Sequence, residues 1–590
     1  MARLHRSFRP ETAHKSEAQL KFWFGLSVAF AAVYGILGLQ QAFGSEYVVQ
    51  DDARQHVFWM QRFTDAGLFP GDLIADYFQS AVPVGYTSLY RLGALLGIDP
   101  MVFNKLLPIA LSLITTGFMF GISMQILPIP VTGFLTTLLL NQNVWMKDDL
   151  ASATPRAFLY PLFAAFLYFL LRRPLASISS RSLFPMLGAI ALQGLFYPQC
   201  VLISAGILCF QPLQWSQGKP GFSKERSEYL FGLAGLAVTV LVLLPFALQS
   251  SEFGPTITLA EARELADFGE NGRSRFFIND PFEFWLVAER SGIFPALWVP
   301  RLMLSGLLLP IIWRFPDRFP LLRQVTGQVK LLPQIIGASV GLFAIAHLLL
   351  FKLQLPSRYT QHSFRFVMAV AAAIAITAIL DALFRWANRQ GDRVAYKKPL
   401  AMGLTALLSG SLIFYPSLVE EFPDPNYKEG DVPALYEFFQ QQPKDTLIAS
   451  LSMEVNNIPS FAQRSILVGR EYAIPYQLGY YNLFRKRVVD LIRAQYSPNL
   501  SAVQEFIQQY GIDFWVLNHD ALTADYVAGE RWVRQHEEVV AEVVATMQQD
   551  NVPALARGVE PCSVLEVGGL VVLQADCLAK LSSAPLDAVQ

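Results

Sequence analysis

The sequence is poor in charge and lacks the short motifs of many soluble enzymes. Only 16% of its 590 residues are charged and 53% are hydrophobic, whereas a soluble chain has about 25% charged residues. It contains no glycine-rich phosphate loop, no Cys/His zinc spacing and no serine-nucleophile motif. These absences give no support to nucleotide hydrolysis, and nothing points to a nucleic-acid partner. The composition instead indicates a polytopic membrane protein.

The charges that are present divide the chain into two parts. Residues 1–417 hold 34 Lys and Arg against 24 Asp and Glu, a net charge of +10, whereas residues 418–590 hold 12 against 23, a net charge of −11. The long apolar runs lie in the first part. We therefore predict a cytoplasmic N-terminal segment (1–21), a helical membrane domain (22–417) and an acidic α/β domain (418–590).

Apolar segments in the first part are long enough to cross or half-cross a bilayer. They lie at 22–43, 103–124, 126–145, 157–171, 183–196, 199–211, 228–248, 293–313, 331–351, 364–384 and 399–417. Clusters of Lys and Arg lie between them, and the positive-inside rule places these clusters in the cytoplasm. The pattern predicts about eleven transmembrane helices in a membrane such as the bacterial plasma membrane, with a cytoplasmic N-terminus and an extracytoplasmic C-terminal domain.

The apolar run 183–211 has basic residues on both sides, with Arg181 before it and Lys219 after it. Both of its ends should therefore face the cytoplasm, so the run must cross twice as a hairpin. Tyr197-Pro198-Gln199 is the expected turn. Helices this short are tolerated where their ends meet protein or water.

The C-terminal part alternates between helix-like and strand-like patterns. Helices are expected at Asp431–Gln441 and 503–510, and strands at 446–451, 466–469 and 514–517. Cys562 and Cys577 flank a predicted hairpin, and a disulfide between them would suit an oxidising compartment.

Two adjacent carboxylates, Asp51 and Asp52, follow the first apolar segment in a predicted outer loop, 44–102. Carboxylates at a membrane surface are costly to desolvate, so they are more often functional than accidental. A partly desolvated carboxylate suits a general base. Alternatively, Asp51 caps the helix-like stretch that continues to Phe63, a position that Asp favours.

This loop continues with a Pro-led segment, Pro83-Val84-Gly85-Tyr86, and a second amphipathic stretch, 89–96. With its acidic pair it resembles the first outer loop of the GT-C superfamily of membrane glycosyltransferases, which includes mannosyl- and aminoarabinosyltransferases. The resemblance implies transfer of a hexosyl or pentosyl group from a polyprenyl-phosphate donor to an extracytoplasmic glycan, lipid or protein, with inversion. It also implies that Asp51 is the catalytic base. Asp52 stands where the family more often has Glu, and would be its neighbour or a metal contact.

The short second outer loop, 145–156, carries Asp148, Asp149 and Arg156. Carboxylates from two loops offer oxygen ligands to a divalent cation such as Mg²⁺ or Mn²⁺, so Asp52, Asp148 and Asp149 are metal candidates. The resemblance also allows the second-loop residues to bind or orient the acceptor substrate. The alternative is an interfacial salt bridge between these acids and Lys147 or Arg156.

Two further loops offer cations for a donor phosphate. Arg358 and Tyr359 follow Pro356 in the predicted loop 352–363, where the resemblance places a donor-phosphate contact. Arg binds phosphate oxygens in pairs and stays charged, although an Arg at a helix end also reaches toward lipid headgroups. His362 nearby is expected to be a helix-end polar residue.

The third outer loop, 249–292, ends near Arg290, which is a secondary phosphate candidate. It also contains the capping-box pattern Thr258-Leu259-Ala260-Glu261, which predicts a helix through about Phe268. Mobile loops often close over the substrates of transferases, so we interpret this segment as a lid, with a solvated connector as the alternative.

Two other classes of function agree less well with the sequence. A transporter or flippase for lipid-linked glycans should carry charged residues at mid-span, and the predicted spans are nearly free of charge at their centres. A non-catalytic membrane scaffold leaves both acidic pairs without a role.

Overall fold

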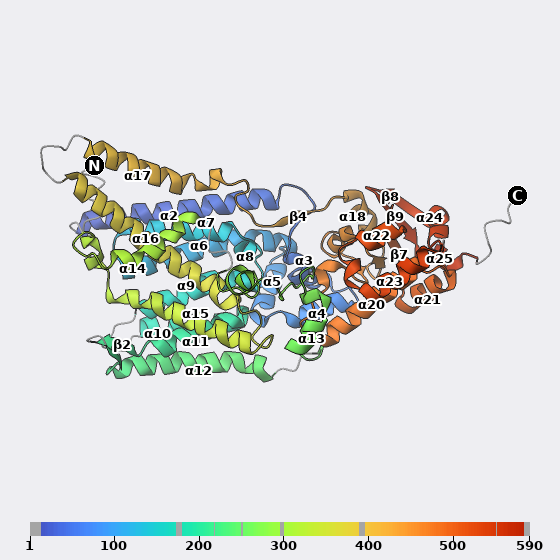
Figure 1. Cartoon of the computed structure of the whole chain (residues 1–590), viewed down its shortest axis with the longest axis horizontal. Helices are drawn as coiled ribbons and strands as arrows, with labels where there is room; N and C mark the ends of the chain where they lie inside the picture. Colours follow the sequence, from blue (N-terminus) through green and yellow to red (C-terminus); the bar gives the residue numbers. More distant parts are fainter. Residues whose placement is uncertain are drawn as a thin grey trace.

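The computed structural model describes residues 13–172, 180–216, 219–248, 252–294, 300–388, 396–549 and 551–582. Two parts lie end to end along its long axis, a helical part at the left of Figure 1 and a part containing a β-sheet at the right. Several of the basic residues used to predict sidedness lie outside the described residues, namely Arg3, Arg6, Arg9, Arg173, Arg389 and Arg393.

The helical part consists of long helices that run roughly parallel to one another (Figure 1). They are α2 (Ala13–Ala42), α6 (Pro100–Ile126), α7 (Pro130–Trp145), α9 (Leu159–Leu171), α10 (Ser180–Phe196), α11 (Pro198–Phe210), α12 (Arg226–Leu248), α15 (Leu331–Leu348), α16 (Arg358–Asn388) and α17 (Lys397–Ile413). The short α14 (Leu309–Ile312) lies in the sequence between α12 and α15. A two-stranded hairpin, β2 (Leu213–Ser216) with β3 (Lys219–Phe222), follows α11.

Among the described residues, five helical stretches are long and apolar enough to cross a membrane, as expected for a membrane protein. They are Glu17–Ala42, Pro100–Ile126, Arg226–Leu248, Gly327–Leu348 and Arg358–Asn388. Shorter apolar helices occur at Pro155–Leu171, Arg181–Phe196, Pro198–Phe210 and Arg301–Ile312. The count of eleven crossings therefore stays a prediction.

Two predicted spans differ in detail. The expected span 293–313 contains a 3-10 helix, η5 (Arg301–Leu308), that continues into α14, and residues 295–299 lie outside the described part of the chain. The helix predicted from 364 begins at Arg358, so the last residues of the predicted loop 352–363 belong to α16. These first turns were expected to be loop because they are polar, and they are buried against polar partners in the helical part.

The hairpin predicted from the charge on both sides of 183–211 is present. Helix α10 ends at Phe196 and α11 begins at Pro198, with Tyr197 between them. Ser204 Oγ donates to Gln193 Oε1 at 2.7 Å, which places the two helices side by side and antiparallel.

Helix ends that were predicted to share one side of the membrane lie together. The backbone N–H of Thr326 donates to Ile126 O at 2.8 Å, and Gln328 Nε2 donates to Leu171 O at 3.3 Å. These bonds join the ends of α6 and α9 to the segment that precedes α15.

The C-terminal part contains a five-stranded sheet in the order β6-β5-β7-β9-β8. Strand β5 is parallel to β6 and β7, and β9 is antiparallel to β7 and β8. The strands are β5 (Leu447–Ser450), β6 (Ser465–Ile466), β7 (Phe514–Asn518), β8 (Ser563–Val567) and β9 (Leu570–Gln574). The helices are α18 (Pro433–Gln440), α19 (Ile458–Phe461), α20 (Leu478–Tyr496), α21 (Leu500–Tyr510), α22 (Ala524–Gly529), α23 (Glu537–Met547), α24 (Ala556–Cys562) and α25 (Ala575–Lys580).

The predicted helices and strands of this part form close to their expected positions, whereas α20 was not predicted. The hairpin of β8 and β9 is flanked by a disulfide between Cys562 and Cys577, whose Cα atoms lie 5.5 Å apart. That bridge joins the end of α24 to α25.

Strand pairing and loop contacts hold the two parts together. Strand β1 (Val48–Gln50), directly before the acidic pair, is antiparallel to β4 (Tyr427–Glu429). The first outer loop also contains α3 (Ala53–His56), η1 (Phe58–Phe63), α4 (Leu73–Ala81) and α5 (Val84–Leu95). Its Tyr77 ring stacks on Tyr480 of α20 with centroids 3.7 Å apart.

The third outer loop, which we call the lid-like loop (249–292, described from residue 252 on), is docked on the C-terminal part. Ile257 N donates to Tyr476 O at 3.0 Å, and Tyr480 N donates to Phe253 O at 3.1 Å. The predicted capping box forms at Thr258 and Glu261, and it begins α13 (Leu259–Glu264). The loop is thus packed against protein in this structure and is not a free solvated connector.

Candidate functional site

The acidic pair lies where the two parts meet, between β1 and α3 (Figure 1). Asp51 N donates to Asn426 O at 3.2 Å. Asp52 occupies the N-cap position of α3, but its side chain makes no capping hydrogen bond. Gln50 Oε1 instead accepts from the backbone N–H groups of Asp52 at 2.9 Å and Ala53 at 3.3 Å. The helix-cap interpretation is therefore wrong, because both carboxylates are left to contact side chains.

Asp52 belongs to a group of ion pairs that we call the second-loop cluster: Asp52, Asp148, Asp149, Arg156 and Arg365. Arg156 Nη2 lies 2.5 Å from Asp52 Oδ2 and 3.1 Å from Asp148 Oδ2, and Arg156 Nε lies 3.6 Å from Asp149 Oδ1. Asp148 and Asp149 begin α8 (Asp148–Ala151), close to α3. The salt bridge with Arg156, predicted from the sequence as the alternative to metal binding, is therefore present. It also includes Asp52 of the first outer loop.

The carboxylates of this cluster have different pKa values. Burial alone would raise the pKa of Asp52, but the positive charges of Arg156 and Arg358 lower it below the usual range. Burial would also raise the pKa of Asp149, which Arg365 and Arg156 bring well below its ordinary value. Burial raises the pKa of Asp148, Arg156 opposes that shift, and the charge of Asp52 adds to it. Asp52 and Asp149 are therefore ionised at neutral pH.

The same contacts bear on the prediction that Asp52, Asp148 and Asp149 bind a divalent cation. The guanidinium of Arg156 lies among these three carboxylates, in the position that a bound cation would need. In the part of the chain that the structure describes, no group of three or more His, Cys, Asp or Glu side chains is placed to hold a metal ion. The carboxylates as arranged therefore do not fit a divalent cation, because the Arg156 guanidinium already lies among them.

Arg365 completes the second-loop cluster from inside the helical part and was missed by sequence reasoning. It is fully buried in α16, and its Nη2 lies 2.7 Å from Asp149 Oδ2. Gln361 Nε2 donates to the same oxygen at 3.2 Å, and Arg365 also donates to the hydroxyl of Tyr160. His362, expected to be a helix-end residue, is buried beside them with Nδ1 3.0 Å from that hydroxyl. An Arg at the start of an otherwise apolar run was the available signal.

Asp51 belongs to a different group, which we call the Glu471 cluster: Asp51, Arg54, Gln55, Arg273 and Glu471. Arg54 pairs with Asp51, and its Nη2 lies 3.1 Å from Glu471 Oε2. Arg273 of the lid-like loop lies 2.6 Å from the other oxygen of Glu471, and Gln55 also donates to it. One buried carboxylate of the C-terminal part thus holds the first outer loop and the lid-like loop together.

We expect Glu471→Gln to destabilise this junction and to slow the reaction. Removing one partner of a buried ion pair typically costs about 3–5 kcal/mol. Here Arg273 loses its ion-pair partner, whereas Arg54 keeps its pair with Asp51. As a positioning residue, Glu471 should affect kcat much more than the KM for the donor. Thermal unfolding and steady-state rates measure the two effects.

Glu542→Gln is the matched control for that substitution. Glu542 pairs with Arg493 at 3.2 Å on the surface, where both side chains are more than half exposed. Surface pairs contribute about 0–1 kcal/mol, so this variant should behave like the wild type. An unchanged melting temperature and kcat in Glu471→Gln would contradict the assigned role.

Arg358 is the first residue of α16 and differs from the other arginines of the site. Among the described residues no carboxylate lies within ion-pairing distance of it, although its charge lowers the pKa of Asp52 and of Asp149. Arg290, the other phosphate candidate, is close to this position because its carbonyl accepts from Ser357 N at 3.3 Å. The Arg290 guanidinium donates to Tyr476 Oη at 3.1 Å.

Tyr359 was predicted to bind substrate beside Arg358. Its side chain is buried, and its hydroxyl donates to Leu353 O at 2.9 Å. Because that hydroxyl is already satisfied within its own loop, we interpret Tyr359 as a support for the position of Arg358.

Neither the protein-family models nor the curated protein sequences contain a match to this chain. Solved structures do match. A structure of the oligosaccharyltransferase of Archaeoglobus fulgidus tethered to an acceptor peptide has a TM-score of 0.53 and 14% identity, and the match covers 88% of this chain and 72% of that one.

Two further structures extend the comparison. The oligosaccharyltransferase AglB of A. fulgidus with an inhibitory peptide and a dolichol-phosphate has a TM-score of 0.50 and 12% identity, covering 89% of this chain and 72% of that one. ArnT of Cupriavidus metallidurans bound to undecaprenyl phosphate covers 95% of this chain and 100% of its own at 14% identity, with a TM-score of 0.46. Only the scores of 0.50 and above bear on the fold, and they show that this chain shares the fold of the A. fulgidus oligosaccharyltransferase.

Proposed function

We propose that the protein is a membrane glycosyltransferase that moves a hexosyl or pentosyl group from a polyprenyl-phosphate donor to an extracytoplasmic acceptor. The observation that carries this proposal is the placement of Arg358, which has no carboxylate partner among the described residues and lies beside the ionised acids of the second-loop cluster. An unpaired guanidinium is available to two phosphate oxygens. The fold shared with AglB, a protein solved with a dolichol-phosphate, supports this choice of donor.

The two carboxylates of the acidic pair would serve different sides of the reaction. Asp52 contacts Arg156, on the side of Arg358 and the donor phosphate. Asp51 lies in the Glu471 cluster, which is built by the lid-like loop and the C-terminal part, where an extracytoplasmic acceptor would arrive. We therefore assign Asp51 as the general base. Its oxygens contact Arg54 and Asn426, but a carboxylate has about four acceptor positions, so about two remain, and one of them can take the proton of the acceptor.

The proposed reaction is a single displacement at the anomeric carbon. The bond between that carbon and the donor phosphate oxygen breaks as a bond to the acceptor oxygen forms. Asp51 takes the proton of the acceptor, and polyprenyl phosphate leaves with the electron pair, held by Arg358 with Arg290 as a second cation. Fixed positive groups aimed at the departing phosphate stabilise the charge that develops there. One displacement inverts the configuration of the sugar.

Arg156 would neutralise the carboxylates in place of a divalent cation, so no step is assigned to a metal. We expect the rate of sugar transfer to be unchanged after exhaustive treatment with EDTA, and to be unaffected by added Mg²⁺ or Mn²⁺. Arg156→Ala should lose activity under both conditions, because Asp52, Asp148 and Asp149 would then repel one another. Loss of wild-type activity on chelation, with recovery on adding Mn²⁺, would contradict this assignment.

A panel of donors tests the proposed function. The purified full-length protein in liposomes would receive radiolabelled mannosyl, glucosyl, arabinosyl and aminoarabinosyl polyprenyl phosphates, together with a total extract of bacterial envelope as the source of acceptors. The proposal predicts transfer of label from at least one donor into the extract. Failure with every donor, by protein that is folded and binds polyprenyl phosphate, would contradict it.

A further inference from the structure

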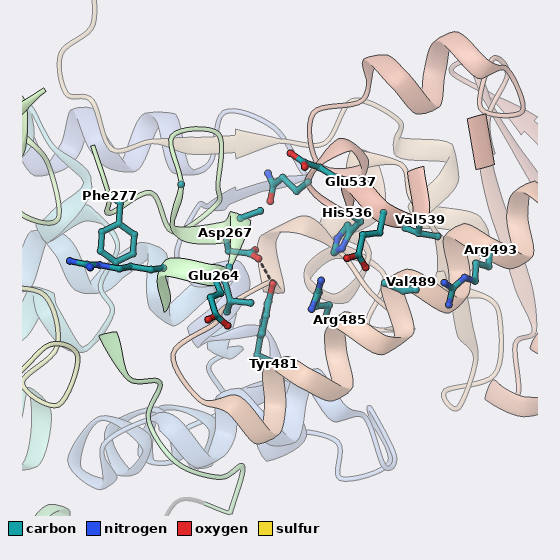
Figure 2. A pocket seen from close by; sticks show the side chains of 16 residues that line it. Glu264, Asp267, Phe277, Tyr481, Arg485, Val489, Arg493, His536, Glu537 and Val539 are labelled. Atoms are coloured by element: carbon teal, nitrogen blue, oxygen red, sulfur yellow. Dashed lines mark hydrogen bonds between the residues drawn. The ribbon is translucent and has the colours of Figure 1, made fainter. Parts of the chain in front are cut away.

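A cavity of about 610 Å³ lies apart from the acid and arginine clusters, between the lid-like loop and the C-terminal part. Figure 2 shows its walls: residues of α13 and the following turn on one side, and residues of α20 and α23 on the other. None of the functional residues assigned above lines this cavity. It therefore needs an explanation of its own.

Helix α20 supplies the longest wall. Tyr481, Arg485, Val489 and Arg493 recur at every fourth position and so share one face of the helix (Figure 2). Twelve residues of α-helix correspond to about 18 Å. A cavity wall of this length can contact several linked units of an extended oligomeric ligand, whereas a single small molecule would cover only part of it.

The charges around the cavity are mixed and nearly balanced. Its lining includes three arginines, Arg263, Arg485 and Arg493, and four acids, Glu264, Asp267, Glu537 and Glu538. Burial and the charge of Arg485 lower the pKa of His536 to about 4, so that side chain is neutral at pH 7. A strongly anionic or cationic ligand would meet repulsion from one of the two sets.

The available groups are those that recognise hydroxyls and the faces of sugar rings. Among the described residues, neither Arg263 nor Arg485 has a carboxylate within ion-pairing distance, so both keep free N–H donors. Arg263 lies 5.9 Å from the centroid of the Phe277 ring. The Phe277 ring adds apolar surface to a lining rich in hydrogen-bonding groups, while Tyr481 is buried behind them.

The cavity is connected to the catalytic region by a short segment of the lid-like loop. The hydroxyl of Tyr481 donates to the carboxylate of Asp267 (Figure 2). The carbonyl of Asp267 accepts from Ser274 N at 2.9 Å, and the neighbouring Arg273 pairs with Glu471. A molecule bound in the cavity would therefore brace the same loop that holds Glu471 beside Asp51.

We propose that this cavity binds an uncharged oligosaccharide section of the acceptor, at a distance from the hydroxyl that reacts. This inference rests on the proposed function for the identity of the ligand as an acceptor. It adds a specificity site between the lid-like loop and the C-terminal part, with Arg485, Arg263 and Phe277 as the residues that would contact the ligand.

The test is equilibrium binding in the absence of any donor. Fluorescently labelled tetrasaccharides of hexose, pentose and N-acetylhexosamine would be titrated into the full-length protein in detergent, with a tetragalacturonate as the anionic probe. At least one neutral probe should bind, and Arg485→Ala should weaken its binding by about tenfold. Lys486→Ala is the matched control, because Lys486 is the next residue of the same helix and pairs with Asp490 outside the cavity.

Each result separates this inference from the proposed function. Binding that is lost in Arg485→Ala but retained in Lys486→Ala and in Asp51→Asn supports the cavity, whether or not the wild type transfers sugar. No binding of any neutral probe, equal binding by Arg485→Ala, or preference for tetragalacturonate would overturn it. Arg485 is exposed on the surface of α20, so its substitution should not disturb folding, and thermal unfolding verifies this.

Discussion

Asp51→Asn is expected to lower the rate of sugar transfer by about 10²–10⁴-fold, the usual contribution of a positioned general base. The amide has nearly the size of the carboxylate and can still contact Arg54 and Asn426, so the junction should remain folded. It cannot take the proton of the acceptor. Because Asp51 is not placed to hold the donor phosphate, the KM for the donor should change little. Initial rates over a range of donor concentrations separate the two parameters.

Substitutions of two other carboxylates serve as comparisons for this result. Asp52→Asn should cause a smaller loss and raise the KM for the donor, since Asp52 orients Arg156 on the phosphate side. Asp65→Asn should have no effect on rate, because Asp65 makes only a surface pair with Lys444 and a turn contact in the same outer loop. A folded Asp51→Asn protein with the wild-type rate would remove Asp51 from the role of base.

Arg358→Ala is expected to lower kcat/KM by about 10²–10³-fold, the scale seen when one preorganised group that stabilises developing charge is removed. The variant loses a guanidinium with no internal counter-charge, so its stability should not fall through a broken ion pair. Arg358→Lys should restore part of the activity, because lysine keeps the charge but not the planar pair of donors.

Binding of polyprenyl phosphate itself gives an independent measure of Arg358. Arg358→Ala should bind this lipid more weakly than the wild type, with Arg358→Lys between them. Arg318→Ala is the control, as Arg318 lies in a different loop, over the ring of Phe315. Equal lipid binding by the wild type and Arg358→Ala would place the phosphate elsewhere.

The features that could be predicted from the sequence are each marked by residues within or next to one short segment. Basic residues on both sides of 183–211 require a hairpin, and the turn at Tyr197 is present. Cysteines on both sides of a strand pair predicted the disulfide between Cys562 and Cys577. The acidic pair and the loop behind it predicted the likeness of fold.

The arrangement of the site depends on contacts between distant segments, and these have no local signal. Glu471 meets Arg54 and Arg273, which are 417 and 198 residues away in the sequence. Arg156 was predicted to bind substrate or, alternatively, to pair with the second-loop acids, and the structure places it among Asp52, Asp148 and Asp149, the three carboxylates predicted together as metal candidates. Helix α20 was missed although its buried Tyr480, Phe484, Val488 and Leu491 follow helical spacing.

The most direct test of the account is the balance of products from a single donor population. The protein in liposomes would be given a polyprenyl phosphate carrying labelled sugar, and free polyprenyl phosphate and labelled glycan would be measured together by mass spectrometry and scintillation. We predict that the wild type releases one lipid phosphate for each sugar transferred and that Asp51→Asn forms both products about 10²–10⁴-fold more slowly. Label that crosses the bilayer while still attached to its lipid, with no free polyprenyl phosphate formed, would show a transporter and contradict the account.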